Sequence, residues 1–354
     1  MPDLKKTLTT AKEKGASDIF IISGHPVSLK INGDFLDYSA VSLSPADTKE
    51  LISEMYRCAD MNLSSEKVIS TGDDDISFAV PGVARYRACL YKQRGSLAAV
   101  IRVIPFVLPV PEEMHIPDEV MSFADMTKGL VLVTGPAGSG KSVTLSCIID
   151  KINSTRANHI ITLEDPIEFL HSHKKSIVSQ REICLDTQNY LSALKSALRQ
   201  APDVILIGEL RDPESISIAM TAAETGHLVL STLHTLGAAN TIDRIVDVFP
   251  AEKQPQIRLQ LSMVLQGVIS QQLIRAADGL QYPAFEIMSA NPAVRTMIRD
   301  SKTHQIESAI QTNSDGGMIT MENSLLTMYK NGLIDKTAAL TYCFNQDTMK
   351  RKLK

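Results

Sequence analysis

The chain has 354 residues, a length that favours two domains, or three, over a single core. Hydrophobic residues make up 44% of it and charged residues 21%, a composition that is ordinary for a globular protein and excludes a disordered chain. The 36 basic and 40 acidic residues leave a formal net charge of −4, so no overall basic field favours binding to nucleic acid or to acidic lipid.

The five cysteines are scattered, odd in number and never spaced as C-x-x-C. This pattern argues against a disulfide framework and against a zinc site, and it fits a reducing cytoplasm. The N-terminus has no apolar run that could act as a signal peptide, and no later stretch approaches the roughly 18 to 20 apolar residues of a membrane span. We therefore expect a cytoplasmic protein that contacts a membrane only through a partner.

Residues 1–108 are predicted to form a mixed α+β domain. Asn32-Gly33 is a strong hairpin signal between two extended runs. Ser44 and Pro45 predict the start of a helix, with serine as the N-cap and proline at the first helical position. The apolar stripe of that helix is Leu51, Ile52 and Met55.

The pattern changes to short, nearly alternating runs over residues 76–104, which predicts a meander of antiparallel strands with Arg85 and Arg87 on one face. Four prolines then fall between residues 105 and 117. Each proline removes a backbone donor and fixes φ, so this stretch is neither a helix nor a central strand. We expect a linker over residues 109–117.

Residues 118–354 are predicted to form an α/β domain. Buried strands that alternate with helical stretches are typical of a parallel sheet with crossover helices. The predicted strands are Leu130–Thr134, His159–Leu163, Val204–Ile207 and Leu228–Ser231. The last hundred residues show helical periodicity, which includes the run IRLQLSMVLQGVISQQLI.

Residues 135–142 read GPAGSGKS, which fits the phosphate-binding pattern G-x-x-x-x-G-K-[ST] between a strand and a helix. Glycines let such a loop turn its N–H groups inward, and the helix presents its positive end to the phosphates. We expect Lys141 to contact the β and γ phosphates of ATP and the Ser142 hydroxyl to help hold Mg²⁺. The residues expected to contact the nucleotide are Gly135, Pro136, Ala137, Gly138, Ser139, Gly140, Lys141, Ser142 and Val143.

Acidic residues end two of the predicted strands. Glu209 follows the run DVILIG, and Glu164 and Asp165 follow the run IITL. Ligands of α/β sheets bind at the carboxyl ends of the strands, so these carboxylates and the phosphate loop suggest a composite site. His227 and His234 stand at the start of another buried strand and just past its end, although a lone histidine is more often structural than catalytic.

In this order and spacing, GPAGSGKS, ITLEDPIEF, LIGELRD and GHLVLSTLHT resemble the Walker A, Asp box, atypical Walker B and His box of secretion-type ATPases. Residues 293–300, AVRTMIRD, are similar to the AIRNLIRE signature of the PilT family of type IV pilus retraction ATPases, with Thr296, Met297 and Asp300 as departures. The N-terminal stretch GASDIFIISGHPVSLKINGDF is also similar, so the resemblance covers nearly the whole chain. The missing four-cysteine zinc motif, which assembly ATPases of this superfamily often carry, favours retraction.

The resemblance implies an N-terminal PAS-like domain, a C-terminal RecA-like P-loop ATPase domain, and a homohexameric motor that hydrolyses ATP to withdraw pilin and power twitching motility. Its partners would be an inner-membrane platform protein and, indirectly, pilin, with no nucleic acid and no zinc. It would work in the cytoplasm at the inner face of the cytoplasmic membrane.

The resemblance also implies roles for single residues. Glu209 would activate water, and Glu164 would support the metal and the water. His234 would sense the γ-phosphate, with His227 nearby. The arginines that the N-terminal domain would bring onto the nucleotide are Arg87, Arg94 and Arg102, whereas Arg85 fits a solvated strand face better.

Three other interpretations remain open from the sequence. A motor of the same fold could drive pilus or pseudopilus assembly or type II secretion. A nucleotide-gated regulator could bind ATP without hydrolysing it. A RecA-like nucleic-acid pump ranks last, because the charge is near neutral and aromatic residues make up only 5%, with no tryptophan.

Overall fold

The computed structural model describes residues 3–31, 33–59, 64–276, 279–313 and 316–353. The chain divides into two compact units, Met1–Val107 and Leu108–Lys354. Within the described ranges, none of the helices combines the length and the apolarity that a membrane crossing requires.

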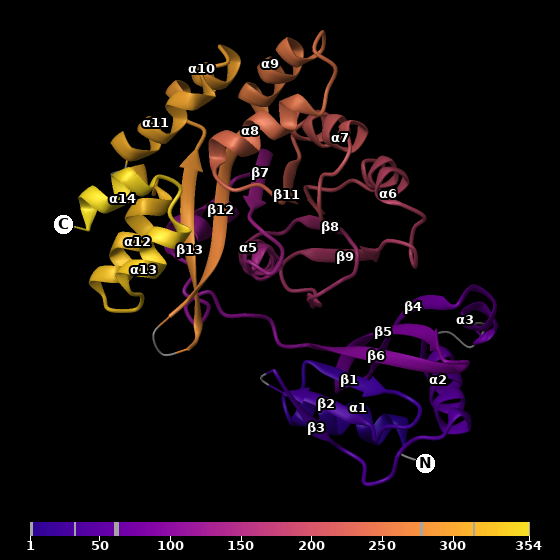
Figure 1. The fold of residues 1–354 in the computed structure, drawn as a ribbon. Coiled ribbons are helices and arrows are strands. Elements are labelled where there is room, and N and C mark those ends of the chain that lie inside the picture. The colour runs from indigo at the N-terminus through magenta and orange to yellow at the C-terminus, as the bar shows by residue number, and fades with distance from the viewer. Residues whose placement is uncertain (1–2, 32, 60–63, 277–278, 314–315, 354) are drawn as a thin grey trace. The chain divides into compact units, whose positions relative to one another are not determined.

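The first unit is built on a six-stranded antiparallel sheet with the strand order β3-β2-β1-β6-β5-β4 (Figure 1). The strands are β1 Asp18–Ile21, β2 Ser28–Ile31, β3 Asp34–Asp37, β4 Asp73–Val80, β5 Ala84–Gln93 and β6 Ser96–Pro105. The helices are α1 Leu4–Glu13, α2 Pro45–Ala59 and α3 Glu66–Thr71. Apolar side chains of the helices and of one sheet face form a single core, which gives the mixed α+β domain that the sequence predicts.

Local signals in this unit are confirmed where the structure describes them. The backbone N–H of Ser44 donates to Oδ2 of Asp47 over 2.8 Å, and the N–H of Asp47 donates back to Oγ of Ser44 over 3.2 Å, so the two residues cap α2 reciprocally. The predicted stripe of α2 is buried. Strands β4 to β6 form the expected meander. β2 pairs with β3, while Asn32 of the predicted hairpin lies outside the described residues.

The second unit contains a seven-stranded sheet with the order β13-β12-β7-β11-β10-β8-β9. All neighbours pair in parallel except β12 and β13, which are antiparallel. The strands are β7 Gly129–Thr134, β8 His159–Glu164, β9 Ile177–Glu182, β10 Val204–Ile207, β11 Leu228–Leu233, β12 Leu265–Arg275 and β13 Gln281–Ser289. The four strands predicted from apolar runs are therefore confirmed within two residues.

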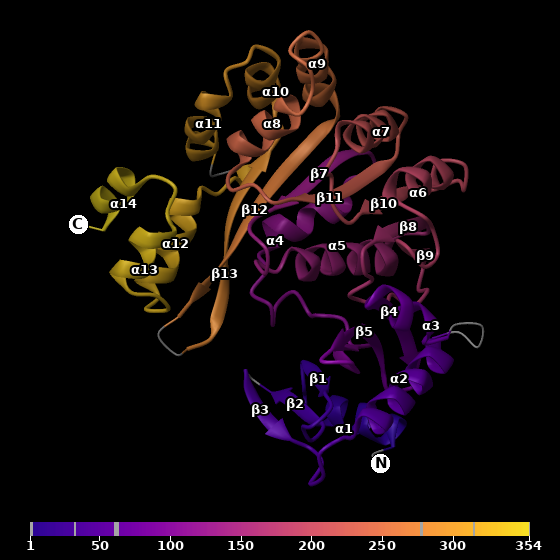
Figure 2. The same ribbon diagram turned by 45° about the vertical axis from the view of Figure 1, so that its right-hand side comes forward.

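Helices cover both faces of this sheet (Figure 2). One face packs against α4 Asp118–Met121, the 3₁₀ helix η1 Ser122–Asp125 and α5 Lys141–Thr155. The other packs against α6 Tyr190–Ala197, α7 Pro213–Glu224, α8 Ala238–Asp247, α9 Gln254–Val264, α10 Pro292–Arg299 and α11 Ile306–Thr312. β7, β10 and β11 are buried along their whole length, which explains why they read as continuous apolar runs.

The C-terminal helices form a small bundle of their own against the long β12–β13 pair. The bundle consists of α12 Met321–Lys330, α13 Lys336–Tyr342 and α14 Gln346–Lys352. A separate 3₁₀ helix, η2 Thr303–Gln305, precedes α11. Figure 1 shows the bundle in yellow, beside β13.

One predicted element is wrong. The run IRLQLSMVLQGVISQQLI is helical only as far as Val264, and its second half is β12. Both faces of β12 are covered, so Gln271 and Gln272 are buried instead of alternating with apolar residues toward solvent. That removes the period of two by which a strand is normally detected.

Candidate functional site

The phosphate loop follows β7 directly and ends where α5 begins at Lys141. Gly135, Gly138 and Gly140 have φ angles of 144°, 75° and 86°, which L-residues with side chains rarely adopt. A Cβ on Gly135 would also lie 2.7 Å from Oγ of Ser139 and would clash with the backbone carbonyl of Gln271. Glycine is therefore required at the first loop position for both conformation and space.

Lys141 is 8% exposed and bends back over the loop that precedes it. Its Nζ donates hydrogen bonds of 2.9 Å to the carbonyl oxygens of Gly135 and Pro136. Burial lowers the pKa of its ammonium, while the carboxylates of Glu209 and Glu168 oppose that shift. An anion beside Nζ would favour the charged form of the lysine.

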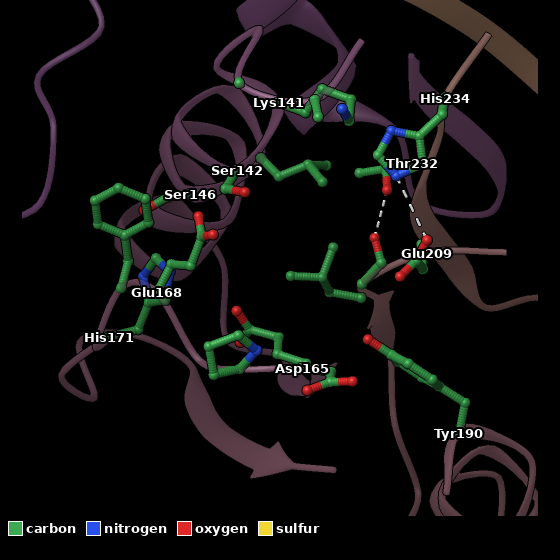
Figure 3. Close-up of a pocket in the computed structure, with 18 residues that line it drawn as sticks. Lys141, Ser142, Ser146, Asp165, Glu168, His171, Tyr190, Glu209, Thr232 and His234 are labelled. Atoms are coloured by element: carbon green, nitrogen blue, oxygen red, sulfur yellow. Dashed lines mark hydrogen bonds and ion pairs between the residues drawn. The ribbon is translucent and has the colours of Figure 1, made fainter. Parts of the chain in front are cut away.

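A pocket of about 270 Å³ lies at the carboxyl ends of the central strands, beside the phosphate loop. Figure 3 shows His234 and Glu209 on one side of it, with Ser142 and Ser146 of α5 on the other and Asp165 below. Because β7, β8, β10 and β11 are parallel, the residues that follow them lie together at the carboxyl ends of these strands. The structure therefore brings Lys141, Ser142, Glu164, Glu209 and His234 together around one cavity.

Glu209 stands two residues after β10 and faces the pocket with a side chain that is 17% exposed. Its Oε1 forms an ion pair with Nη2 of Arg211. Its Oε2 lies 3.5 Å from Nε2 of His234. The carboxylate is thus paired with Arg211 and lies next to His234, and its position beside the phosphate loop suits a general base.

Glu164 is the last residue of β8. β8 pairs with one side of β10, and β11 pairs with the other. Its Oε1 accepts hydrogen bonds from Oγ1 of Thr162 over 2.6 Å and from Nε2 of Gln180 over 3.1 Å. Burial raises the pKa of Glu164 to about 7, although both hydrogen bonds favour the carboxylate. This carboxyl group therefore changes charge near neutral pH.

The pocket is also lined by side chains that sequence reasoning misses, and these include Ser146, Glu168, His171 and Tyr190. Ser146 lies one helical turn beyond Ser142, a spacing that could have revealed it. Its Oγ is buried and has no hydrogen-bond partner among the described residues, which suits a polar ligand. Burial lowers the pKa of His171 to about 4 and raises that of Tyr190, and no local pattern in the sequence points to either residue.

His227 requires a correction, because it was expected near His234. It precedes β11, whereas His234 follows that strand. Six residues of extended chain span roughly 20 Å, so the two histidines lie at opposite ends of β11. Nδ1 of His227 lies 2.9 Å from the carbonyl oxygen of Ala222, and the carbonyl oxygen of His227 accepts from the N–H of Gly129. These contacts give His227 a structural setting away from the pocket.

The candidate arginines all lie in the first unit. Arg87 on β5 and Arg102 on β6 are direct cross-strand partners. Nε of Arg87 lies 3.7 Å from Asp75, and Nε of Arg102 lies 3.3 Å from Asp18. Arg94 is exposed in the tight turn between the two strands, where its φ is 48°.

The residues at the pocket fit a nucleotide together with Mg²⁺ better than a metal alone. Among the described residues, no group of three or more His, Cys, Asp or Glu side chains could hold a metal ion. Mg²⁺ usually takes one or two protein ligands and completes its shell with phosphate and water oxygens. The Ser142 hydroxyl and the nearby carboxyl group of Glu164 match that pattern.

A parallel sheet with a strand–loop–helix phosphate cradle, and with acidic residues at the ends of neighbouring strands, defines a P-loop nucleotide-binding protein. The family model for type II/IV secretion system proteins matches residues 1–350. The chain belongs to that family.

Individual relatives are similar over most of their length. The chain is 45% identical over 338 residues, 95% of this chain and 97% of the relative, to a Pseudomonas aeruginosa protein named "Type IV pilus retractation ATPase PilT". It is 45% identical over 323 residues, 91% of this chain and 85% of the relative, to the "Twitching motility protein" of Neisseria gonorrhoeae.

A crystal structure described as the pilus retraction motor PilT with bound ADP superposes with a TM-score of 0.91 at 42% identity, and the match covers 99% of this chain and 100% of that one. This likeness confirms the expected fold class, a RecA-like P-loop domain with a smaller N-terminal α+β PAS-like domain.

Proposed function

We propose that this chain is a motor ATPase that assembles as a homohexamer and powers the retraction of a type IV pilus. The observation that carries the proposal is the pocket in which Lys141, Glu209 and His234 converge. It is supported by the 45% identity to the Pseudomonas protein named for pilus retraction and by the structural match to a retraction motor with bound ADP.

The described residues suggest how hydrolysis would proceed. Lys141 turns from the loop carbonyls to the β and γ phosphates, because the phosphate oxygens are stronger acceptors for an ammonium group. Ser142 and Glu164 would hold Mg²⁺, whose charge offsets that of the phosphate oxygens during transfer. Glu209 takes the proton of the attacking water. His234, 3.5 Å from Glu209, links the position of that base to the γ-phosphate.

Arginines of the first unit would complete the site in the assembled ring. Guanidinium groups stabilise charge on a transferring phosphoryl group, and Arg87, Arg94 and Arg102 are the candidates. We further propose that residues 1–108 act as a PAS-like domain, residues 109–117 as a linker and residues 118–354 as the motor domain. The division of the chain between Val107 and Leu108 supports the first of these boundaries to within one residue.

The motor would act in the cytoplasm on an inner-membrane platform protein, through which it would withdraw pilin from the fibre. Two experiments test the proposal together. Purified protein should release phosphate from ATP, and a clean deletion strain should become hyperpiliated and lose twitching motility. A deletion strain without pili would instead identify an assembly motor, and ATP binding without phosphate release would identify a regulator.

A further inference from the structure

Strand β12 carries three consecutive polar side chains that are almost completely buried. Ser270, Gln271 and Gln272 are 0%, 2% and 7% exposed. Burying a hydroxyl or an amide is costly unless it is hydrogen-bonded, so the partners of these residues show what the strand holds in place. β12 pairs with β7, and Ser270 lies opposite Thr134, the last residue before the phosphate loop.

Gln271 is the member of this triplet that reaches the phosphate loop. Its Oε1 accepts a buried hydrogen bond of 2.7 Å from Oγ1 of Thr144, in the first turn of α5. Its backbone carbonyl fills the space where Gly135 would carry a Cβ. Its Nε2 lies 2.9 Å from the position that a Cβ on Gly140 would take. One residue therefore touches the start of the loop, its end and the helix that follows.

The two neighbours of Gln271 point to the other face of the sheet, because side chains alternate along a strand. Oγ of Ser270 accepts from the N–H of Gly237 over 2.9 Å. Nε2 of Gln272 donates to the carbonyl oxygen of Tyr342 over 3.0 Å, in the C-terminal bundle. Gln272 thus offers a matched comparison: an adjacent buried glutamine with one hydrogen bond that does not involve the loop.

We propose that Gln271 is a positioning residue that holds the phosphate loop and the first turn of α5 in the geometry that binds a nucleoside di- or triphosphate. Gln271 does not line the pocket and acts through Thr144 and the two loop glycines. The inference rests on the proposed nucleotide binding. It adds a side chain more than a hundred residues beyond the loop that no phosphate-binding motif contains.

The test is the affinity of the full-length protein for ADP, measured by calorimetric titration, together with the KM and kcat for ATP. Gln271→Met keeps the length of the side chain and removes the acceptor. We expect the Kd for ADP and the KM for ATP to rise about tenfold, with a smaller change in kcat, because the loop binds ground state and transition state alike.

Variants of Thr144 test whether the effect passes through its hydroxyl. Thr144→Val should weaken ADP binding by a similar factor, and Thr144→Ser should preserve it. The double variant Gln271→Met with Thr144→Val should bind ADP no more weakly than either single variant, since both remove the same hydrogen bond. Gln272→Met should lower the melting temperature and leave the Kd unchanged.

The outcomes separate this inference from the proposed function. If the unaltered protein does not bind ADP, both fall. If it binds ADP and Gln271→Met binds equally well, or if Gln272→Met weakens binding as much, the positioning role is overturned while the proposed function stands. If Gln271→Met does not fold, the Thr144 pair decides: weaker binding by Thr144→Val than by Thr144→Ser supports the role, and equal binding overturns it.

Discussion

Nε2 of His234 lies 3.5 Å from Oε2 of Glu209, although the two residues follow different strands. β10 and β11 are parallel neighbours that pair from Val204 with Leu228 to Ile207 with Ser231. Both residues lie a short distance beyond the carboxyl ends of their strands, so the register of the sheet sets the distance between them. The candidate base and the candidate phosphate sensor are therefore held by backbone pairing, and each can be tested separately.

Glu209→Gln should reduce kcat for ATP hydrolysis by about 10²- to 10⁴-fold, because an amide cannot accept the proton of the attacking water. ADP binding should persist, since the amide keeps the shape of the side chain. Phosphate release under saturating ATP measures the effect. Glu214→Gln, which alters a surface ion pair with Lys195, is the matched control and should leave kcat unchanged. Normal turnover by Glu209→Gln would reassign the base.

Lys141→Ala should abolish measurable ATP binding, because it removes the buried ammonium that would meet the phosphates. Lys151→Ala provides the control on the same helix, where Nζ donates to the carbonyl oxygen of Met121 outside the pocket. Nucleotide titration of both variants checks the prediction. Equal ADP affinities for the two variants would contradict the assignment of the phosphate loop.

Glu164 should make the stability of the nucleotide-free protein depend on pH. Its pKa is raised from 4.5 to about 7, so the folded state binds the proton more tightly than the unfolded state does. This contribution is fully present below about pH 4.5 and is lost as the pH rises through about 7. Denaturant unfolding between pH 5 and 8 should show a shallower decline for Glu164→Gln. Burial also raises the pKa of Glu286 to about 7. The stability of the Glu164→Gln variant should therefore still decline in part as the pH rises, because Glu286 remains.

Asp212 follows Glu209 closely, yet the structure gives it a different task. Its Oδ1 accepts from the N–H of Ser215 and its Oδ2 from Oγ of Ser215, both over 2.8 Å, at the N-terminus of α7. Asp212→Ala should lower the free energy of unfolding by about 1 kcal/mol, as the loss of an N-cap usually does. The KM for ATP should stay the same. A large increase in KM at unchanged stability would instead place Asp212 in the site.

Removal of the candidate arginines should slow hydrolysis in the assembled ring without dissociating ADP. Arg87→Ala, Arg94→Ala and Arg102→Ala should each reduce kcat, by about 10²-fold for a guanidinium that contacts the transferring phosphoryl group. Arg85→Ala, on the same face of β5 as Arg87, serves as the control. Sedimentation must show the same assembly for all four variants. An equal loss for Arg85→Ala would point to a general effect on the sheet.

Continuous apolar runs revealed four strands of the second sheet, because those strands are buried on both faces. The same burial concealed β12, where buried glutamines fill positions that would otherwise mark one face as apolar. β9 and β13 lie at the edges of the sheet and were not predicted. Their pairing partners are set by the tertiary fold, which local periodicity does not report.

Local sequence patterns likewise identify only some of the residues of the candidate site. The sequence identifies Lys141, Ser142, Glu164, Glu209 and His234 because each lies in the loop motif or at or just beyond the end of a strand. Tyr190, His171 and Gln271 reach the site or the loop from elsewhere in the chain, so only the fold identifies them. The family resemblance implies a place for His227 near His234, but His227 precedes β11 and His234 follows it, so the two lie at opposite ends of that strand.

The place of β7 between β11 and β12 has a consequence for synthesis on the ribosome. A nascent chain translated as far as Gly226 contains the whole phosphate loop and neither strand that flanks it. The N–H of Gly135 then lacks its acceptor, the carbonyl oxygen of Leu233, and Thr144 lacks Gln271. The loop and the first turn of α5 therefore gain these two hydrogen bonds only after β11 and β12 have been translated, so both contacts form late in synthesis.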